Sequence, residues 1–414
     1  MRRIAIVGAG WAGLSCAVEA VAGGASVTVF EATRTPGGRA RTVAGRQPSL
    51  DNGQHILIGA YVDTLALMRR VGADPQRLLL RRPLSLRFPD GGGLSLPRGP
   101  ALPALLAGIL RASGWTWSDK AALLRTAVRW RLQGFRCDVS LTVCELCSAL
   151  PSRIRDELID PLCVSALNTP PETASGDVFL RVLRDALMAT TGGSDLLLPR
   201  ADLDSLFPTP AVNWLRHAGA RVLLGQRVME IRPGGAAWQV NGETFDTVVL
   251  ACPPGEAARL AQNAAPENSG WAATARALGF EPLATVYAQA PHGLAEPMLA
   301  LRSSPSMPAQ FVFDRGRLGG PQGLLAFVVS ASRHGRDALE SAVVEQAGRQ
   351  LSLLVKPIGT LIEKRATFAC TPGLVRPPMH IAAHLLACGD YIEGPYPATL
   401  EGAVRSGLAA ARQA

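Results

Sequence analysis

The sequence predicts an α/β fold, in which a Rossmann-type dinucleotide-binding domain is assembled from separate stretches of chain and joined to an α+β second domain. Two stretches lead to this prediction. Residues 4–31 read as strand, glycine-rich turn, helix and strand, and residues 385–413 read as strand, turn and helix. The chain of 414 residues is also too long for one ordinary core. We therefore expect two domains, the first of them discontinuous.

The glycine-rich turn has the spacing of a phosphate-binding loop. Gly8, Gly10 and Gly13 form G-x-G-x-x-G directly after the apolar strand 4–7. Such glycines allow a tight turn and a close approach to a diphosphate, which the free N–H groups of the following helix bind. Glu31 ends the second strand, where a carboxylate bonds ribose hydroxyls and disfavours a 2′-phosphate. This motif alone fits either NAD or FAD.

A Gly-Gly-Arg motif follows the acid. Gly37, Gly38 and Arg39 resemble the second fingerprint of the FAD-binding amine oxidase and phytoene desaturase superfamily. The glycines allow close backbone approach, and the arginine can neutralise a diphosphate. The resemblance implies FAD and a flavin amine oxidase-like fold. Because no cysteine or histidine lies at a convincing attachment position, we expect the flavin to be bound without a covalent bond.

The C-terminal segment resembles the same superfamily. After the short strand 385–388, Gly389 and Asp390 match its turn for the flavin diphosphate and ribityl chain. The helix that follows Ala398 and Thr399 would then point its N-terminus at the pyrimidine end of the flavin. N–H groups at a helix start stabilise negative charge on a reduced flavin.

The middle of the chain indicates how the domains interleave. Residues 220–254 read as strands with an Asn241-Gly242 hairpin turn, and the resemblance places a backbone contact near Val228 at the adenine. The expected FAD-binding domain comprises residues 1–82, 200–265 and 371–414, and the expected substrate-binding domain comprises 83–199 and 266–370. In the latter we expect strands at 282–289, 309–314 and 323–330 and a helix at 336–355.

The stretch "LDNGQHILIGAY", residues 50–61, narrows the resemblance further. Together with "EKRATFACTPG", residues 363–373, it resembles the hydroxysqualene dehydroxylase family, and the similarity extends over nearly the whole chain. The resemblance implies FAD-dependent reductive removal of the hydroxyl group of hydroxysqualene to give squalene, on the route to hopanoids. One departure is Tyr391, where tryptophan is common in related enzymes. Because no second dinucleotide motif is evident, we expect an external electron donor.

Loss of a hydroxyl group as water requires a proton donor. The resemblance implies that residues 51–55 lie near the flavin ring. The candidates are His55, which we favour, Asp51 and Tyr391. Lys364 is expected on a strand surface. The alternatives to a dehydroxylase are a carotenoid or isoprenoid desaturase, an amine oxidase, and a non-catalytic flavin-binding pathway protein.

The charge distribution favours a membrane surface over a nucleic acid. The net charge is +9, but no nucleic-acid-binding module is recognisable. Residues 98–136 combine apolar helix segments, three tryptophans and many arginines, as interfacial segments do, although core helices with basic ends fit the same pattern. No signal peptide or membrane-spanning run is evident. We expect a cytoplasmic protein, peripheral on the inner membrane if this segment contacts lipid.

Overall fold

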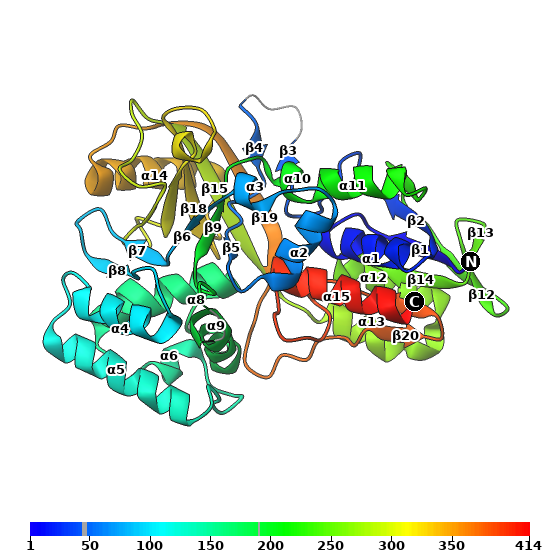
Figure 1. Ribbon diagram of the computed structural model, residues 1–414, viewed down its shortest axis with the longest axis horizontal. Coiled ribbons are helices and arrows are strands. Elements are labelled where there is room, and N and C mark those ends of the chain that lie inside the picture. The colour runs from blue at the N-terminus through cyan, green and yellow to red at the C-terminus, as the bar shows by residue number, and fades with distance from the viewer. Residues whose placement is uncertain (44–47, 189–190) are drawn as a thin grey trace.

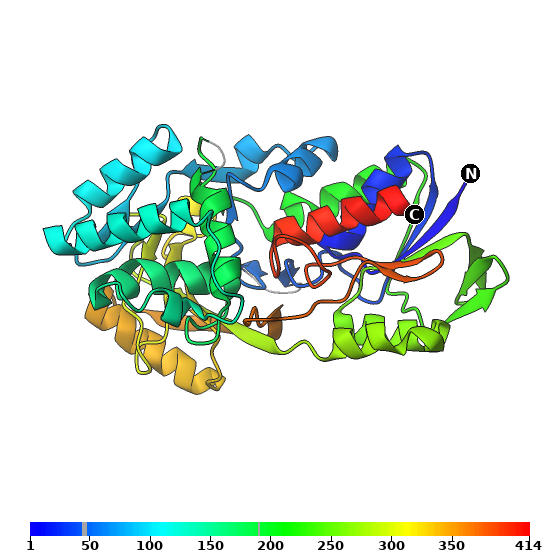
Figure 2. The ribbon, with the colours of Figure 1, turned by 90° about the horizontal axis from the view of Figure 1, so that it is seen from below.

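The computed structural model describes residues 1–43, 48–188 and 191–414. Two regions follow one another along the long axis of the molecule (Figures 1 and 2). The first region is built around a six-stranded sheet, and the second region contains a five-stranded sheet.

The six-stranded sheet draws its strands from widely separated parts of the chain. In sheet order they are β10 (Arg221–Leu224), β2 (Ser26–Glu31), β1 (Arg3–Val7), β14 (Thr247–Leu250), β21 (Leu385–Ala387) and β20 (His380–Ala382). Neighbouring strands are parallel except for β20. The apolar runs of these strands suit a parallel sheet whose two faces are both buried.

Helices cover both faces of this sheet because successive side chains of a strand point to opposite faces. Ile4 and Ile6 of β1 belong to the core that contains α1 and α15, whereas Ala5 and Val7 belong to the core that contains α12. The helices of this region are α1 (Trp11–Ala22), α11 (Pro208–His217), α12 (Pro254–Ala264), α13 (Ser269–Arg276) and α15 (Leu400–Gln413). Figure 2 shows α15 and α12 on opposite sides of the sheet.

A small antiparallel sheet extends the same region. Its strands are β11 (Ile231–Gly234), β12 (Ala237–Val240) and β13 (Glu243–Phe245). Asn241 and Gly242 join the last two, both with positive φ, so the predicted hairpin turn is confirmed.

The five-stranded sheet is antiparallel and carries α14 (Arg336–Leu351) on one face. Its strands, in order, are β16 (Met298–Ala300), β17 (Phe311–Asp314), β18 (Leu324–Ser330), β15 (Phe280–Gln289) and β19 (Lys356–Phe368). The three predicted strands and the helix are confirmed, although the helix ends at Leu351 because Ser352 adopts a left-handed conformation. Of strand β19, the sequence predicts only that Lys364 lies on a strand.

A helical layer lies against the second region. It contains α4 (Ala101–Arg111), α5 (Trp117–Leu132), α6 (Val143–Leu146), α7 (Ser152–Ile154), a π-helical turn at Arg155–Ile159, α8 (Asp160–Leu167) and α9 (Gly176–Met188). Within the described residues, no helix is both long and apolar enough to cross a membrane.

Short strands and helices complete the fold. They are β3 (Thr42–Val43) paired with β4 (Leu50–Asp51), β5 (Leu57–Ile58) and β6 (Leu79–Arg82) on either side of β9 (Leu196–Pro199), β7 (Ser85–Arg87) paired with β8 (Gly93–Ser95), α2 (Val62–Arg70), α3 (Pro75–Leu78) and α10 (Leu203–Leu206). Two single 3₁₀ turns lie at Pro266–Asn268 and Gly316–Leu318. The proposed domain boundaries themselves stay a prediction.

The packing of α15 on α1 depends on one glycine. A Cβ atom added at Gly407 would lie 2.2 Å from the Ala12 carbonyl oxygen, so the two helices cannot keep their separation with any larger residue. We expect Gly407→Ala to lower the free energy of unfolding by about 1–3 kcal/mol, the usual effect of overpacking. Urea denaturation measures it.

The matched control is Gly348→Ala in α14, where an added Cβ meets nothing within 4 Å. That substitution should raise stability by about 0.5–1 kcal/mol, because alanine restricts the unfolded chain more than glycine does. Equal effects of the two substitutions would contradict the close approach of α15 to α1.

Candidate functional site

The loop between β1 and α1 forms a cradle of glycines. Gly8 has a φ of +116°, and a Cβ there would lie 2.7 Å from the Ala251 carbonyl oxygen. A Cβ at Gly13 would lie 2.0 Å from the Gly8 carbonyl oxygen, so α1 must start close against the strand. The N-cap of α1 is Gly10, which has no side chain to cap the helix. The first N–H groups of α1 are thus available to an anion.

The second glycine motif lies against the first. The Gly37 N–H donates to the Ala9 carbonyl oxygen at 2.8 Å. Gly38 has a φ of +64°, and a Cβ there would lie 3.3 Å from the Gly10 Cα atom. The two motifs therefore form one surface of bare backbone.

The Glu31 carboxylate is fixed at the end of β2. One oxygen accepts from the Ala9 N–H at 2.8 Å, and the other accepts from the Thr33 N–H and hydroxyl, each at 2.8 Å. The carbonyl oxygen of Glu31 accepts from the Gln226 N–H at 2.8 Å, which brings the segment carrying the buried Val228 alongside. Carboxylate oxygens can accept more than one hydrogen bond each, so Glu31 retains capacity for ribose hydroxyls.

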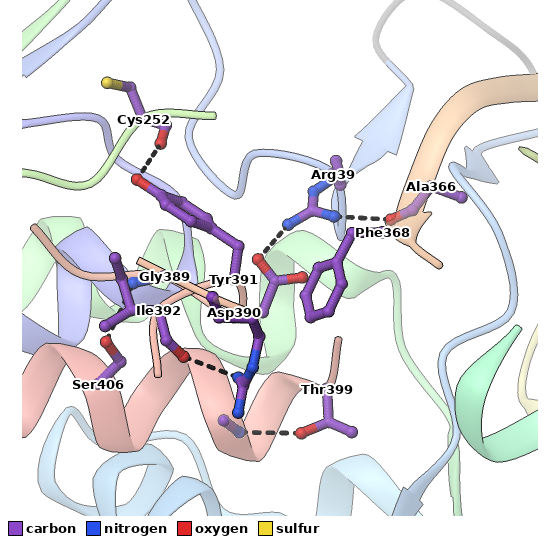
Figure 3. A network of polar contacts seen from close by, with 12 residues as sticks. Arg39, Cys252, Ala366, Phe368, Gly389, Asp390, Tyr391, Ile392, Thr399 and Ser406 are labelled. Atoms are coloured by element: carbon purple, nitrogen blue, oxygen red, sulfur yellow. Dashed lines mark hydrogen bonds and ion pairs between the residues drawn. The ribbon is translucent and has the colours of Figure 1, made fainter. Parts of the chain in front are cut away.

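Arg39 and Asp390 join the two ends of the chain, 351 residues apart (Figure 3). The guanidinium and carboxylate lie 2.5 Å apart, and Arg39 also donates to the Ala366 carbonyl oxygen at 2.7 Å. Burial alone would lower the pKa of Arg39, but Asp390 raises it above its ordinary value. Arg39 thus keeps its positive charge beside the glycine surface.

The start of α15 lies beside Asp390. Thr399 is its N-cap and accepts from the Gly402 N–H at 2.9 Å, and the Ala398 N–H donates to the Asp390 carbonyl oxygen at 3.3 Å. Ala398 has a φ of +57°, a strained conformation for a residue with a side chain. Such strain is kept where the surrounding structure requires a specific backbone path, here the entry to α15.

Tyr391 is already hydrogen-bonded in this geometry, and its predicted catalytic role stays a prediction. Its hydroxyl donates to the Cys252 carbonyl oxygen at 3.2 Å, and its ring fills the space where a Cβ of Gly389 would lie, 2.6 Å away (Figure 3). Burial raises the pKa of Tyr391 well above its ordinary value. An already bonded hydroxyl with so high a pKa argues against the expectation that Tyr391 donates the proton.

Asp51 lies in a closed buried network. It is 3% exposed, and its carboxylate accepts from the Thr42 hydroxyl at 2.9 Å and the Leu203 N–H at 3.0 Å. The Arg315 guanidinium lies 3.8 Å from its second oxygen. Burial raises the pKa of Asp51 to about 6. These partners hold β4 to the chain around it, and the predicted catalytic role of Asp51 stays a prediction.

The same network includes Tyr287 and Gln54. The Tyr287 hydroxyl donates to the Asp51 carbonyl oxygen at 2.8 Å and accepts from the Gln54 amide at 2.8 Å. Arg315 donates to the Gln54 side-chain oxygen at 3.4 Å. Sequence reasoning missed Tyr287 and Arg315. The sequence gives only weak signals for them. Tyr287 is one of four tyrosines, and Arg315 directly follows an apolar strand.

His55 is held in its neutral form. Its Nε2 lies 3.2 Å from the Asn52 carbonyl oxygen and donates to it, and Gly53 packs beside the ring. Burial lowers the pKa of His55 to about 4, and the positive charge of Arg39 adds to this effect. At neutral pH the ring is uncharged, which argues against His55 as a cationic acid.

The polar stretch nevertheless adjoins the flavin motifs. The Asn52 amide donates to the Arg39 carbonyl oxygen at 3.0 Å and to the Glu363 carboxylate at 3.2 Å. Sequence reasoning missed Asn52 and Glu363 as supports of this arginine. Lys364 is exposed on β19, as expected.

Comparison with known proteins decides the family. The model of the flavin-containing amine oxidoreductases matches residues 11–414. The chain belongs to this family. It is therefore a flavin-dependent oxidoreductase, and its cofactor is FAD.

Several relatives of this family member are similar over nearly their whole length. The hydroxysqualene dehydroxylases of Rhodopseudomonas palustris and Sinorhizobium fredii are each 27% identical over 99% of this chain and 97% of their own. The resemblance to that group is thus confirmed. The zeta-carotene desaturase of Zea mays is 33% identical, but over only 22% of this chain and 18% of its own.

Solved structures of the family share the fold. Cyclohexylamine oxidase from Brevibacterium oxydans superposes with a TM-score of 0.68 and 16% identity, covering 100% of this chain and 98% of that chain. The predicted flavin amine oxidase-like α/β fold is confirmed.

The described residues fit FAD. The bare backbone of Gly8, Gly10 and Gly38 is a surface that added Cβ atoms would obstruct, and the uncapped start of α1 with Arg39 supplies positive potential for a diphosphate. The Glu31 carboxylate can accept hydrogen bonds from the adenosine ribose, and the N–H groups at the start of α15 can stabilise negative charge on the flavin ring. The assignment of these residues to FAD stays a prediction.

We expect Arg39→Ala to weaken FAD binding by about 10- to 100-fold, because a hydrogen bond to a charged group contributes about 1.5–3 kcal/mol. Fluorescence titration of the apoprotein with FAD measures it. The control is Arg82→Ala, which removes an arginine paired with Glu296 outside the site. Unchanged affinity in Arg39→Ala would contradict the role of this arginine.

Asp51 should make stability depend on pH in an unusual direction. Its pKa rises from 3.8 to about 6 on folding, so between these values the folded protein holds a proton that the unfolded chain has lost. The contribution of Asp51 to stability therefore falls as pH rises from about 4 to 6 and stays low above that.

The comparison uses Asp51→Asn, which cannot titrate. The stability of the native protein minus that of Asp51→Asn should decrease by about 3 kcal/mol between pH 4 and pH 7. Urea unfolding at a series of pH values measures both. A difference that is independent of pH would show that Asp51 titrates normally in the folded protein.

Proposed function

We propose that this FAD-dependent oxidoreductase removes the hydroxyl group of hydroxysqualene to give squalene, in squalene and hopanoid biosynthesis. The observation that carries the proposal is the extent of similarity. Relatives named hydroxysqualene dehydroxylase align over 97% of their length, whereas the zeta-carotene desaturase of Zea mays aligns over 18% of its own. A local match indicates a shared cofactor motif, but an end-to-end match includes the substrate region.

The reaction is a two-electron reduction of the substrate. The C–O bond breaks, the oxygen leaves as water with one added proton, and a C–H bond forms from a hydride. Reduced FAD, when bound, supplies hydride chemistry of this kind. Because the oxidised cofactor must be reduced again for each turnover, the proposal includes an external electron donor.

The chain supplies a positive, water-poor setting for this chemistry. Arg39 stays charged beside the uncapped start of α1, and both favour an anionic cofactor. Ile56, Leu283 and Leu361 are half-buried apolar side chains on the segments around residues 51–55. We propose that they line the path of the isoprenoid chain and exclude water from the reacting carbon.

In this proposal His55 acts as a neutral hydrogen-bonding group. With its pKa near 4, the ring is neutral at physiological pH and offers a hydrogen bond, not a positive charge. A neutral ring does not repel a developing allylic cation. The buried setting that removes the charge from His55 therefore suits the substrate better than an imidazolium would.

The test is a single turnover of the reduced holoenzyme. We expect chemically reduced protein under nitrogen to be reoxidised on mixing with hydroxysqualene, with one squalene formed per flavin. Flavin absorbance and lipid mass spectrometry follow the two products. The control is the same mixture with squalene as the added lipid, which should leave the flavin reduced.

The opposite result would support a desaturase. If hydroxysqualene leaves the reduced flavin unchanged while the oxidised holoenzyme dehydrogenates phytoene, the proposal is wrong and the partial similarity to zeta-carotene desaturases becomes the better guide. Oxidation of an amine with reduction of the flavin would likewise overturn it.

A further inference from the structure

The outer face of α5 carries an apolar stripe that no element of the protein covers, within the residues that the structure describes. We call it the outer stripe, and its members recur at helical spacing: Trp117, Ala121, Val128 and Leu132. Leu124 has the same helical phase but is half-buried and packs against the core. Trp117, Val128 and Leu132 are 74%, 57% and 83% exposed. A surface helix normally presents polar side chains on this face. The outer stripe is therefore unusual for a helix that contacts only water.

The opposite face of α5 already provides its core packing. Leu123 and Trp130 point inward and are 5% and 4% exposed. Trp115, just before the helix, is also buried, and its indole N–H donates to the Glu157 carboxylate at 2.7 Å. Of the three tryptophans in residues 98–136, two thus belong to the core and only Trp117 faces outward. The outer stripe is not needed to fold the helix.

Arginines flank the outer stripe. Arg125 and Arg131 lie on its two sides by helical phase, at roughly 60° from its centre at 100° per residue. Both are exposed, as are Arg111, Arg129 and Arg136. In the part of the chain that the structure describes, none of the five forms an ion pair. The one acid of α5, Asp119, is held in a capping box with Thr116.

Helix α4 adds exposed apolar residues at the same end of the molecule. Leu106 and Leu110 are 47% and 48% exposed, and the Lys120 ammonium group of α5 donates to the Leu110 carbonyl oxygen at 2.8 Å. Both views place α4 and α5 together at the end of the molecule opposite the chain termini (Figures 1 and 2). Six of the twelve large apolar side chains exposed within the described residues lie between positions 106 and 139.

We propose that the outer stripe of α5 docks on the surface of an anionic lipid bilayer. Apolar side chains would enter the boundary between headgroups and acyl chains, and long arginine side chains on either side would reach the phosphates. A second copy of this chain fits less well, because it would bring unpaired arginines face to face. A nucleic acid offers the phosphates but no apolar layer. The proposal does not depend on the reaction catalysed.

The test measures co-sedimentation of the full-length holoenzyme with vesicles. We expect binding to vesicles of phosphatidylglycerol and phosphatidylcholine in equal parts, and much weaker binding to phosphatidylcholine alone. Val128→Gln/Leu132→Gln should lower the affinity for the mixed vesicles by at least about tenfold, because it removes two apolar side chains from the stripe. Leu354→Gln is the matched control, since Leu354 is 87% exposed but lies outside α5.

A second pair of variants isolates the charge. Arg125→Gln/Arg131→Gln should weaken binding at low salt by about tenfold or more, since each basic residue near an anionic surface contributes about 1 kcal/mol. Arg69→Gln/Arg216→Gln removes two exposed arginines elsewhere and should not. Circular dichroism and flavin content confirm that every variant is folded.

Three results would overturn the proposal. The first is no binding of the native protein to the mixed vesicles. The second is an equal loss of binding in a stripe variant and its matched control. The third is a dimer, detected by sedimentation velocity, that Val128→Gln/Leu132→Gln converts to a monomer, since that would assign the outer stripe to a second copy of the chain.

Discussion

The close approach of the last helix to the first is the constraint on which the rest of the site depends. Gly407 lets α15 lie against the Ala12 carbonyl of α1, and this fixes where α15 begins. Asp390, ten residues before Leu400 at the start of α15, then meets Arg39 from the other end of the chain. The pair is only partly buried, with the Arg39 side chain 36% and the Asp390 side chain 10% exposed, and it is favourable where its geometry is fixed because both groups lose part of their water. The contact between Gly407 and the Ala12 carbonyl holds the backbone in place, and the ion pair of Arg39 with Asp390 depends on that fixed backbone.

Burial then decides what each polar side chain of the site can do. His55 and Asp51 were chosen from the sequence as residue types that carry protons, but Asp51 is buried and His55 is half-buried. Loss of hydration disfavours the charged form in each case, so the histidine stays neutral and the carboxyl group holds its proton to higher pH. Their hydrogen bonds to neighbouring backbone and side chains make them supports of the loop at residues 51–55. Residue type alone cannot show this, because the effect arises from what surrounds the group.

The sequence predicts the parts of this site that local backbone geometry specifies. The positive φ angles at Gly8 and Gly38 and the strand–turn–helix units at both ends are properties of short segments, and all of these elements form as expected. The network of Asp51 with Tyr287 and Arg315 was not predictable, because both partners lie more than 230 residues from Asp51 in the sequence. Apart from the place of Lys364, strand β19 was missed for a related reason: its charged and apolar residues do not alternate regularly, and its pairing with β15 shifts register twice.

The three tryptophans of residues 98–136 show how one residue type serves two purposes within a single segment. Trp117 and Trp130 are thirteen positions apart, which is about 220° around a helix at 100° per residue, so one must face outward when the other faces the core. This phase gives the outer stripe a fixed side of α5, and α5 lies at the end of the molecule opposite the six-stranded sheet and the chain termini (Figure 1). A protein docked through α5 would keep its flavin-binding sheet on the side away from the bilayer. Under the proposed function and the proposed docking, an external electron donor would reach that side from the surrounding water while hydroxysqualene would enter from the lipid.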